Sequence, residues 1–384
     1  MNVRIERRLS QPRWLSVAVP VVSLVVAFLL IAVVLVATGH NPWTTYKDLF
    51  EAAFTAEGAL TQTLIGATPL VFTGLCAAAA FRMNLFNIGG EGQLYFGAIG
   101  ASAAGIYFGG QGTPFLVVVM MIAGFAGGAA WALIPGLLRA YLSTNEIITS
   151  LMLNYVAGLF LTYLIFDSHS YWRDTESASA AVFPVGKALS DAANWPTFGS
   201  SVVVPFGFIL GIVAAALLWV LYSRTKFGFE VQVMSDSQRA ARYSGMRTRR
   251  KILAVMALSG GLAGLGGASQ VGDFLHTLDA DPKGLRSYGY GYAGIVVASL
   301  ARYNPFAVVL VAFLLGGLQN AGAALQGPDF PSGLVGVMEG MILFTTLGGE
   351  LFVRYRLRFT RKHPHTAATS PAPASDAPAA EAAQ

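Results

Sequence analysis

The stretch that decides the fold runs from residue 60 to residue 81 and reads LTQTLIGATPLVFTGLCAAAAF. These 22 residues contain no charged side chain. As a helix they would be about 33 Å long, which is enough to cross the ~30 Å hydrocarbon core of a bilayer. Further apolar blocks of similar length follow on both sides. The sequence therefore predicts a polytopic membrane protein built only from helices.

The composition of the whole chain agrees with this prediction. Of its 384 residues, 54% are hydrophobic and 12% are charged, against about a quarter charged in a soluble domain. The 43 glycines are also numerous, and small residues let membrane helices approach one another closely. We expect pairs such as Gly124/Gly128 and Gly260/Gly264 to set the distances between helices.

The apolar blocks predict about ten transmembrane helices. They divide into two halves of five around a long loop, residues 167–201, and an odd number per half means that the second half is inverted. The ten blocks are Leu15–Thr38, Leu60–Phe81, Leu85–Phe108, Phe115–Leu138, Ile147–Phe166, Val202–Tyr222, Ile252–Val271, Gly289–Leu300, Pro305–Leu325 and Leu334–Phe352.

The distribution of cations predicts the orientation. With a cytoplasmic N-terminus, 20 of the 25 Lys and Arg fall on the inside, as the positive-inside rule requires. Both termini are then cytoplasmic in the plasma (inner) membrane. Residues 1–14 form an N-terminal arm, residues 15–352 form the membrane domain, and residues 353–384 form a basic and then Ala/Pro-rich tail. That tail cannot bury a core, so we expect it to be disordered.

The sequence lacks the motifs that are typical of several classes of function. There is one cysteine, Cys76, and the five histidines are scattered, so we expect no metal site. No GxxxxGK[ST] phosphate loop, GxSxG elbow or HExxH motif occurs. We therefore expect no catalytic residue and no cofactor bound by this chain. In a membrane protein the basic excess reflects topology, so no nucleic acid partner is expected.

Two glycine-interrupted segments occupy equivalent places in the two halves. Residues 86–93 read FNIGGEGQ, and residues 287–294 read SYGYGYAG. Such breaks mark the midplane binding site of transporters, because their freed backbone groups must line a cavity. They are equally typical of glycine-rich connections between helices.

Polar side chains within the apolar blocks are the candidates for a substrate pathway. Hydrogen bonding between helices explains any one of them as well, and an aromatic belt at the membrane interface also explains the tyrosines. The candidates are Asn87, Glu91, Gln93, Asn154, Tyr288, Tyr290, Gln319 and Asn320.

Residues 223–251 form the one long cytoplasmic joint, with eight cations. A capping box at residues 235–238 predicts a short helix that ends at Gly245. The helix could dock on a soluble motor, or the joint could simply fix topology against anionic lipid. The residues assigned to the helix are Ser235, Gln238, Arg239, Ala240, Ala241, Arg242 and Gly245.

At these places the chain resembles the inner-membrane permeases of ATP-binding-cassette (ABC) importers. The superfamily is that of ribose and branched-chain amino acid permeases, and the resemblance is to its nucleoside and simple-sugar branch. Four stretches carry it in the family's order: Phe86–Gly100, Thr144–Ala157, Lys226–Gly267 and Tyr288–Gln319.

The resemblance implies a permease subunit for nucleoside import. Its partners would be a second related permease, an ATP-binding subunit with two nucleotide-binding domains that uses ATP and Mg²⁺, and an external substrate-binding lipoprotein. The short helix of the joint would be the ATPase-coupling helix. Import of a simple sugar or a branched-chain amino acid is the alternative within this architecture. A secondary transporter driven by an ion gradient and a membrane enzyme are the alternatives of other classes.

Overall fold

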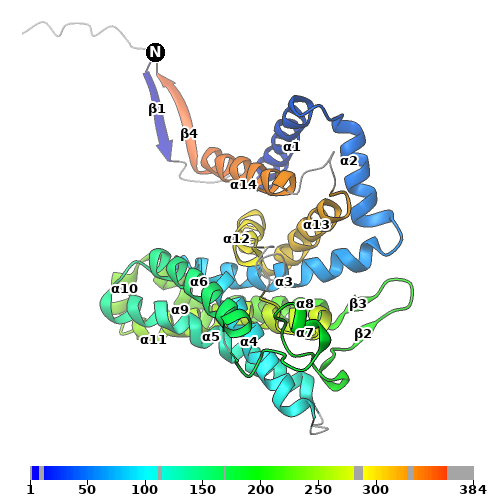
Figure 1. Ribbon diagram of the computed structural model, residues 1–384. Coiled ribbons are helices and arrows are strands. Elements are labelled where there is room, and N and C mark those ends of the chain that lie inside the picture. Colours follow the sequence, from blue (N-terminus) through cyan, green and yellow to red (C-terminus); the bar gives the residue numbers. More distant parts are fainter. Residues whose placement is uncertain are drawn as a thin grey trace, which may run out of the picture.

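The computed structural model describes residues 2–7, 13–110, 115–167, 169–280, 289–326 and 333–360. The predicted disordered tail, residues 353–384, is wrong at its start, because residues 353–354 end the last helix and Tyr355–Thr360 form a strand. Residues 361–384 and Tyr288 lie outside the described ranges. Helices dominate the described chain, as predicted (Figure 1). The long helices are α1 (Arg13–Ala37), α3 (Ala59–Phe81), α4 (Gly90–Gly109), α5 (Leu116–Leu142), α6 (Glu146–Thr162), α8 (Phe206–Arg224), α11 (Thr248–Ser269), α13 (Pro305–Ala324) and α14 (Gly333–Arg354).

Shorter elements connect and extend the long helices. The helical ones are α2 (Pro42–Phe50), α7 (Ala178–Val182), α9 (Lys226–Asp236), α10 (Gln238–Tyr243), α12 (Tyr290–Leu300), the π-helical turns η1 (Glu51–Thr55), η2 (Tyr163–Asp167) and η4 (Gln270–Leu275), and the 3₁₀ turn η3 (Asp191–Ala193). Strand β1 (Asn2–Arg7) pairs antiparallel with β4 (Tyr355–Thr360), and β2 (Thr197–Phe198) pairs with β3 (Val204–Pro205). The β1–β4 pair brings the two ends of the described chain together.

Each of the ten predicted blocks contains a helix, but not every helix is long and apolar enough to cross a bilayer by itself. Within the part of the chain that the structure describes, six are: α3, α5, α6 with η2, α8, α11 with η4, and α13. A seventh span is possible in the pair α1 and α2–η1, which bends by 117° at its break. α12 is short. The ten-span topology and the side of the membrane that the termini face remain predictions.

α3 lies at the centre of the molecule. Every residue from Ala67 to Phe81 is buried, which explains why this stretch shows no amphipathic period. α11, α12 and α13 all pack against it. α3, which contains the stretch 60–81 from which the fold class was predicted, is thus the helix around which the others assemble.

Glycines set the contact between α4, α5 and α11, as their spacing predicted. A Cβ on Gly128 would lie 2.2 Å from the carbonyl oxygen of Gly260, and one on Gly264 would lie 2.2 Å from that of Gly124. Real Cβ atoms do not come this close. The backbones of α5 and α11 therefore touch, and any larger residue would push these helices apart.

A second, smaller core lies apart from the first. It joins Ile31 and Leu35 of α1, Leu49 of α2, and Met338 and Ile342 of α14. α1 and α14 run side by side, and in Figure 1 α12 and α13 separate them from α4, α5 and α11. α2 follows α1 without having been predicted, because nine residues with several polar side chains give no membrane-span signal.

Candidate functional site

The first predicted break is a real interruption of the helical structure. α3 ends at Phe81 and α4 begins at Gly90, while Asn84 between them has a positive φ of 55°. Neighbouring groups hold the interrupted backbone. The amide of Ile88 donates to the hydroxyl of Ser150 on α6 at 3.2 Å. We call residues 85–89 the first break.

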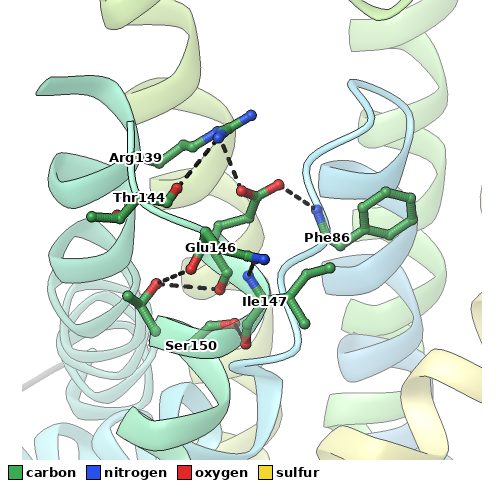
Figure 2. A network of polar contacts seen from close by, with 8 residues as sticks. Phe86, Arg139, Thr144, Glu146, Ile147 and Ser150 are labelled. Atoms are coloured by element: carbon green, nitrogen blue, oxygen red, sulfur yellow. Dashed lines mark hydrogen bonds and ion pairs between the residues drawn. The ribbon is translucent and has the colours of Figure 1, made fainter. Parts of the chain in front are cut away.

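A partly buried ion pair fixes the other end of this break (Figure 2). Arg139 at the end of α5 lies 3.2 Å from a carboxylate oxygen of Glu146, and it also donates to the carbonyl of Thr144 at 3.3 Å. The second carboxylate oxygen accepts from the amide of Phe86 at 3.5 Å. Figure 2 shows the Glu146 carboxylate between Arg139 and Phe86. The α5–α6 turn therefore holds the start of the first break.

A group of polar side chains lies behind the break, inside the main core. The amide nitrogen of Asn87 donates to Gln93 Oε1 and to Ser259 Oγ, both at 2.9 Å. Gln93 returns a bond of 2.8 Å to Asn87 Oδ1, and Ser259 donates to the carbonyl of Cys76 at 2.7 Å. We call the set Cys76, Asn87, Glu91, Gln93, Asn154 and Ser259 the central polar cluster. It joins α3, the first break, α4, α6 and α11.

Glu91 connects the two predicted glycine-interrupted segments, although the structure places residues 290–294 of the second segment in helix α12 rather than in a break. One of its carboxylate oxygens accepts from the hydroxyl of Tyr95, and the other accepts from the backbone amide of Gly291, each at 2.5 Å. Gly291 belongs to the first turn of α12, so the carboxylate lies at the positive end of that helix. A Cβ on Gly291 would lie 2.1 Å from the Glu91 amide nitrogen. Two segments 200 residues apart in the chain are therefore in direct contact.

Asn154 of α6 also links α4, the first break and α12 by hydrogen bonds. Its Oδ1 accepts from the amide of Gly92 at 2.9 Å, and its Nδ2 donates to the carbonyl of Ile88 at 2.8 Å and to the hydroxyl of Tyr292 at 3.3 Å. Asn154 is 3% exposed, whereas the Tyr292 side chain is 44% exposed. One buried amide thus bonds to α4, the first break and α12, and its tyrosine partner reaches the surface of this chain.

The structure brings together four of the candidate pathway residues: Asn87, Glu91, Gln93 and Asn154. Tyr290 is the buried first residue of α12, next to Gly291. Tyr288 lies outside the described residues. The structure also adds Cys76, Ser259 and Tyr292. A single hydroxyl or thiol in an apolar block is too common to mark a site, so sequence gave little reason to select Ser259 or Cys76.

Gln319 and Asn320 do not join the central polar cluster. Gln319 donates to Glu339 of α14 at 3.0 Å, and Asn320 donates to Thr63 on α3 at 3.2 Å. Thr63 and Cys76 are 13 residues apart on the same helix, which corresponds to about 20 Å. These two amides hold α13 against its neighbours, which was the other interpretation of the sequence.

The joint at residues 223–251 contains the predicted short helix, with one correction. Ser235 does not open it, because α9 continues through Asp236; the cap is Ser237, whose hydroxyl accepts from the amide of Ala240 at 3.2 Å. The predicted end is confirmed. Gly245 has φ 74°, and the amides of Gly245 and Met246 bond to Arg242 and Ala241, which is a Schellman motif.

α10 is anchored by a buried residue and exposes several of its other side chains. Ala241 is fully buried, while Arg239, Ala240, Arg242 and Tyr243 are exposed, Tyr243 by 94%. The preceding helix α9 is fastened to α11 by an ion pair between Glu230 and Lys251.

Ser235 contacts the turn that precedes the first break. Asn84 Nδ2 donates to its carbonyl oxygen at 2.9 Å and to its hydroxyl at 3.0 Å. The joint therefore bonds directly to the turn between α3 and the first break.

A helix break beside buried polar groups, together with a short helix on a basic joint, is typical of the membrane subunit of a transporter. The comparison with known families agrees. The chain belongs to the family of branched-chain amino acid transport system permease components, whose match covers residues 59–347. It is thus an ABC transporter permease, a multi-pass protein of the cell membrane that is not itself catalytic. An ion-gradient transporter and a membrane enzyme are excluded.

The curated relatives carry different cargoes. The chain is 30% identical to a nucleoside ABC transporter permease protein of Lactococcus lactis subsp. cremoris, over 86% of this chain and 90% of that one. It is 32% identical to a guanosine ABC transporter permease protein of Bacillus subtilis, over 89% and 94%. It is 30% identical to a glucose ABC transporter permease protein of Haloferax volcanii, over 93% and 94%.

Proposed function

We propose that this chain forms the transmembrane pathway for nucleoside uptake by an ABC importer. The observation that carries the proposal is the contact between Glu91 at the start of α4 and Gly291 at the start of α12, which joins two segments 200 residues apart beside the central polar cluster. In the predicted topology these two segments belong to different halves of the chain. In transporters with inverted halves, substrate binds at the interface between the halves, near the bilayer midplane. Ten spans in two inverted halves of five fit this arrangement.

The chemistry of the cluster suits a nucleoside. Asn87, Gln93 and Asn154 carry amides, which can donate to and accept from the edge of a nucleobase or a ribose hydroxyl. The indole nitrogen of Trp131 is buried and has no hydrogen-bond partner among the described residues. A Cβ on Gly92 would lie 2.9 Å from this nitrogen and 3.1 Å from Asn154 Oδ1. An unpaired buried donor beside the cluster supports the arrival of a polar ligand.

We propose that α10 is the helix through which an ATPase subunit moves this permease. Arg239, Ala240, Arg242 and Tyr243 form its free surface. Movement of the joint would reach the first break through the bonds between Ser235 and Asn84. From there it would reach Asn87, three residues further on, and through it the central polar cluster.

The partners of the complete importer follow from this assignment. We propose a second related permease, an ATP-binding subunit with two nucleotide-binding domains that uses ATP and Mg²⁺, and an external substrate-binding lipoprotein. The joint and both termini would then lie in the cytoplasm. The outer segments of that topology hold 11 acidic residues against five basic ones, which would give the lipoprotein an acidic surface to meet.

Uptake by the complete importer tests the cargo. Cells that express the importer are given labelled adenosine together with an excess of unlabelled guanosine, ribose, glucose or leucine. We expect guanosine to suppress uptake and the other three to leave it unchanged. Suppression by ribose or glucose alone would assign the chain to sugar import, the alternative that the Haloferax relative favours. Suppression by leucine would assign it to branched-chain amino acids.

A further inference from the structure

A cavity of about 540 Å³ lies between the two apolar cores. Its walls come from α1, α2, η1, α12, α13 and α14. Leu24 and Phe28 of α1 face it from one side, and Leu314 and Leu318 of α13 face it from the other. Because α13 is long and apolar enough to cross a bilayer, the cavity lies at the depth of the hydrocarbon region. It is separate from the central polar cluster, none of whose members line it.

The walls offer a ligand almost no polar group. Only Tyr46 and Thr346 among the lining residues carry a hydroxyl, and both hydroxyls are already used. Tyr46 donates to the carbonyl of Phe28 at 2.6 Å, and Thr346 donates to the carbonyl of Ile342. A nucleoside or a sugar would lose its hydrogen bonds with water here and gain none. A hydrocarbon chain makes no hydrogen bonds with water, so it would lose none on entering the cavity.

The cavity can be entered from the lipid. Phe50 is 60% exposed and Leu314 is 50% exposed at its wall, although both are large apolar side chains. The volume falls within the range of sites that enclose one small molecule. Its size and access therefore fit an acyl chain that enters sideways from the bilayer.

α2 carries the groups that a phospholipid head would need. Tyr46, Leu49 and Phe50 on one face line the cavity. Lys47, Asp48 and Glu51 are all exposed, and no ion pair among the described residues joins them. Lys47 is three residues from Phe50 along the helix, so their Cβ atoms are about 5–6 Å apart. A cation and two carboxylates beside the mouth complement a headgroup that carries both a phosphate and an amine.

Trp43 supports the same placement. It is 79% exposed and lies four residues before Lys47, on the same side of α2. Tryptophan is enriched at the depth of the lipid headgroups. α2 would then lie in the interface, while the cavity beneath it lies in the hydrocarbon.

We propose that the cavity binds one acyl chain of a phosphatidylethanolamine molecule, with the lipid phosphate at Lys47 and its amine at Asp48 or Glu51. The bound chain fills the space between the α1–α14 pair and α13. It thereby joins the smaller core to the core that contains the pathway.

Photo-crosslinking tests the proposal. The importer complex is reconstituted in vesicles of phosphatidylethanolamine and phosphatidylglycerol, with a trace of either lipid bearing a diazirine in its acyl chain. After irradiation, labelled peptides are mapped by mass spectrometry. We expect the phosphatidylethanolamine probe to label α1, α2 and α13 above the level on the exposed face of α8. We expect the phosphatidylglycerol probe to label them less.

Two variants fill the cavity and one is a matched control. Leu314→Trp and Leu24→Trp should each reduce labelling to the level on α8, whereas Leu217→Trp, at a 64% exposed position of α8, should leave it unchanged. Lys47→Gln should reduce labelling by about fivefold, because one Lys near a lipid surface contributes about that factor. Gel filtration of each complex checks that it is folded.

Three results would overturn the proposal. Equal labelling of all lipid-facing helices would show only the general lipid boundary. Labelling that persists in both cavity-filling variants would place the lipid elsewhere. A cross-link from this wall to the partner permease would show that a protein surface occupies it.

Discussion

Asn84 is the residue through which the joint contacts the turn before the first break. Both its backbone conformation and its side chain suit this contact. Its φ of 55° is one that Asn tolerates better than most residues, and its amide supplies the two bonds to Ser235. A larger or branched residue would be strained here, and a residue without an amide could not make the bonds. The position therefore combines a backbone requirement with a side-chain requirement.

Replacing Asn84 with Gly separates the two requirements, because Gly accepts the positive φ but has no amide. We expect Asn84→Gly to retain folding and basal ATP hydrolysis in the complex but to lower uptake by about 3- to 10-fold, since one to two hydrogen bonds are lost. Uptake and ATPase rates on the same reconstituted complex measure this. Unchanged uptake would show that the joint does not act through Asn84.

Glu91 is buried, yet its carboxylate is bonded to Tyr95 and Gly291. We expect Glu91→Ala to lower stability by about 1–3 kcal/mol, because it leaves the buried Gly291 amide without its acceptor. Glu91→Gln keeps one acceptor oxygen and should destabilise less. Thermal unfolding of the purified complex compares the two variants. If the Gln variant also imports cargo at the normal rate, Glu91 leaves the list of pathway residues.

At the scale of elements, the packing of α4 against α12 depends on Gly291. The nearest atoms to a Cβ there belong to the backbone of Glu91 and Gly90, which cannot rotate away as a side chain could. The contact between α4 and α12 is therefore a backbone contact, and it tolerates only glycine at this position.

Gly291→Ala should separate α12 from α4 and abolish uptake, although Ala is the better helix former by about 1 kcal/mol. Gly340→Ala in α14 is the matched control, since nothing lies within 4 Å of a Cβ at that position. We expect it to be neutral or slightly stabilising. Expression, unfolding temperature and uptake of both variants provide the measurement, and a fully active Gly291→Ala variant would contradict the contact.

At the scale of the whole molecule, the chain has two separate surfaces for its proposed tasks. The first break and the central polar cluster lie within the main core, whereas α10 lies with α9 at one end of the molecule (Figure 1). Arg239 and Arg242 of α10 are exposed. The joint bonds to the turn before the first break through Asn84, and the guanidinium of Arg249 lies over the ring of Tyr141 on α5. Arg239 and Arg242 make no ion pair among the described residues, so assembly with an ATPase can be disturbed without touching the core.

The double variant Arg239→Glu with Arg242→Glu should remain folded in the membrane but lose its ATPase subunit on purification, and with it uptake. Charge reversal on an interface opposes docking by electrostatic repulsion and mismatch. The control is Arg247→Glu with Arg250→Glu, which makes the same charge change on exposed residues of the same joint. If both doubles behave alike, the joint acts only through its total charge.

Much of the fold could be predicted from local sequence. A run of about 20 apolar residues needs no partner to be recognised as a candidate span, so a helix was found in every predicted block. Boundaries were less certain: the block Leu85–Phe108 began five residues too early, because the apolar residues of the first break resemble those of a helix. The amphipathic helix α2 was missed because its polar side chains give no membrane-span signal, and the cap of α10 was misplaced because α9 continues through Asp236.

The residues of the candidate site could also be predicted only in part from the sequence. A polar residue in an apolar block was enough to select Asn87, Glu91, Gln93 and Asn154, because burying it requires a partner. The same signal also selected Gln319 and Asn320, because a buried amide needs a hydrogen-bond partner whether it lines a pathway or holds two helices together. Sequence could not tell which amides would share one cluster.

The sequence by itself determined the membrane class, the positions of the helical blocks and the first glycine break, because hydropathy and glycine content act over one helix at a time. Tertiary structure alone decided that α4 and α12 meet at Glu91 and Gly291, that Ser235 bonds to Asn84, and that a cavity lies between the two cores. These contacts join residues as far as 200 positions apart, and their geometry depends on how closely the backbones approach.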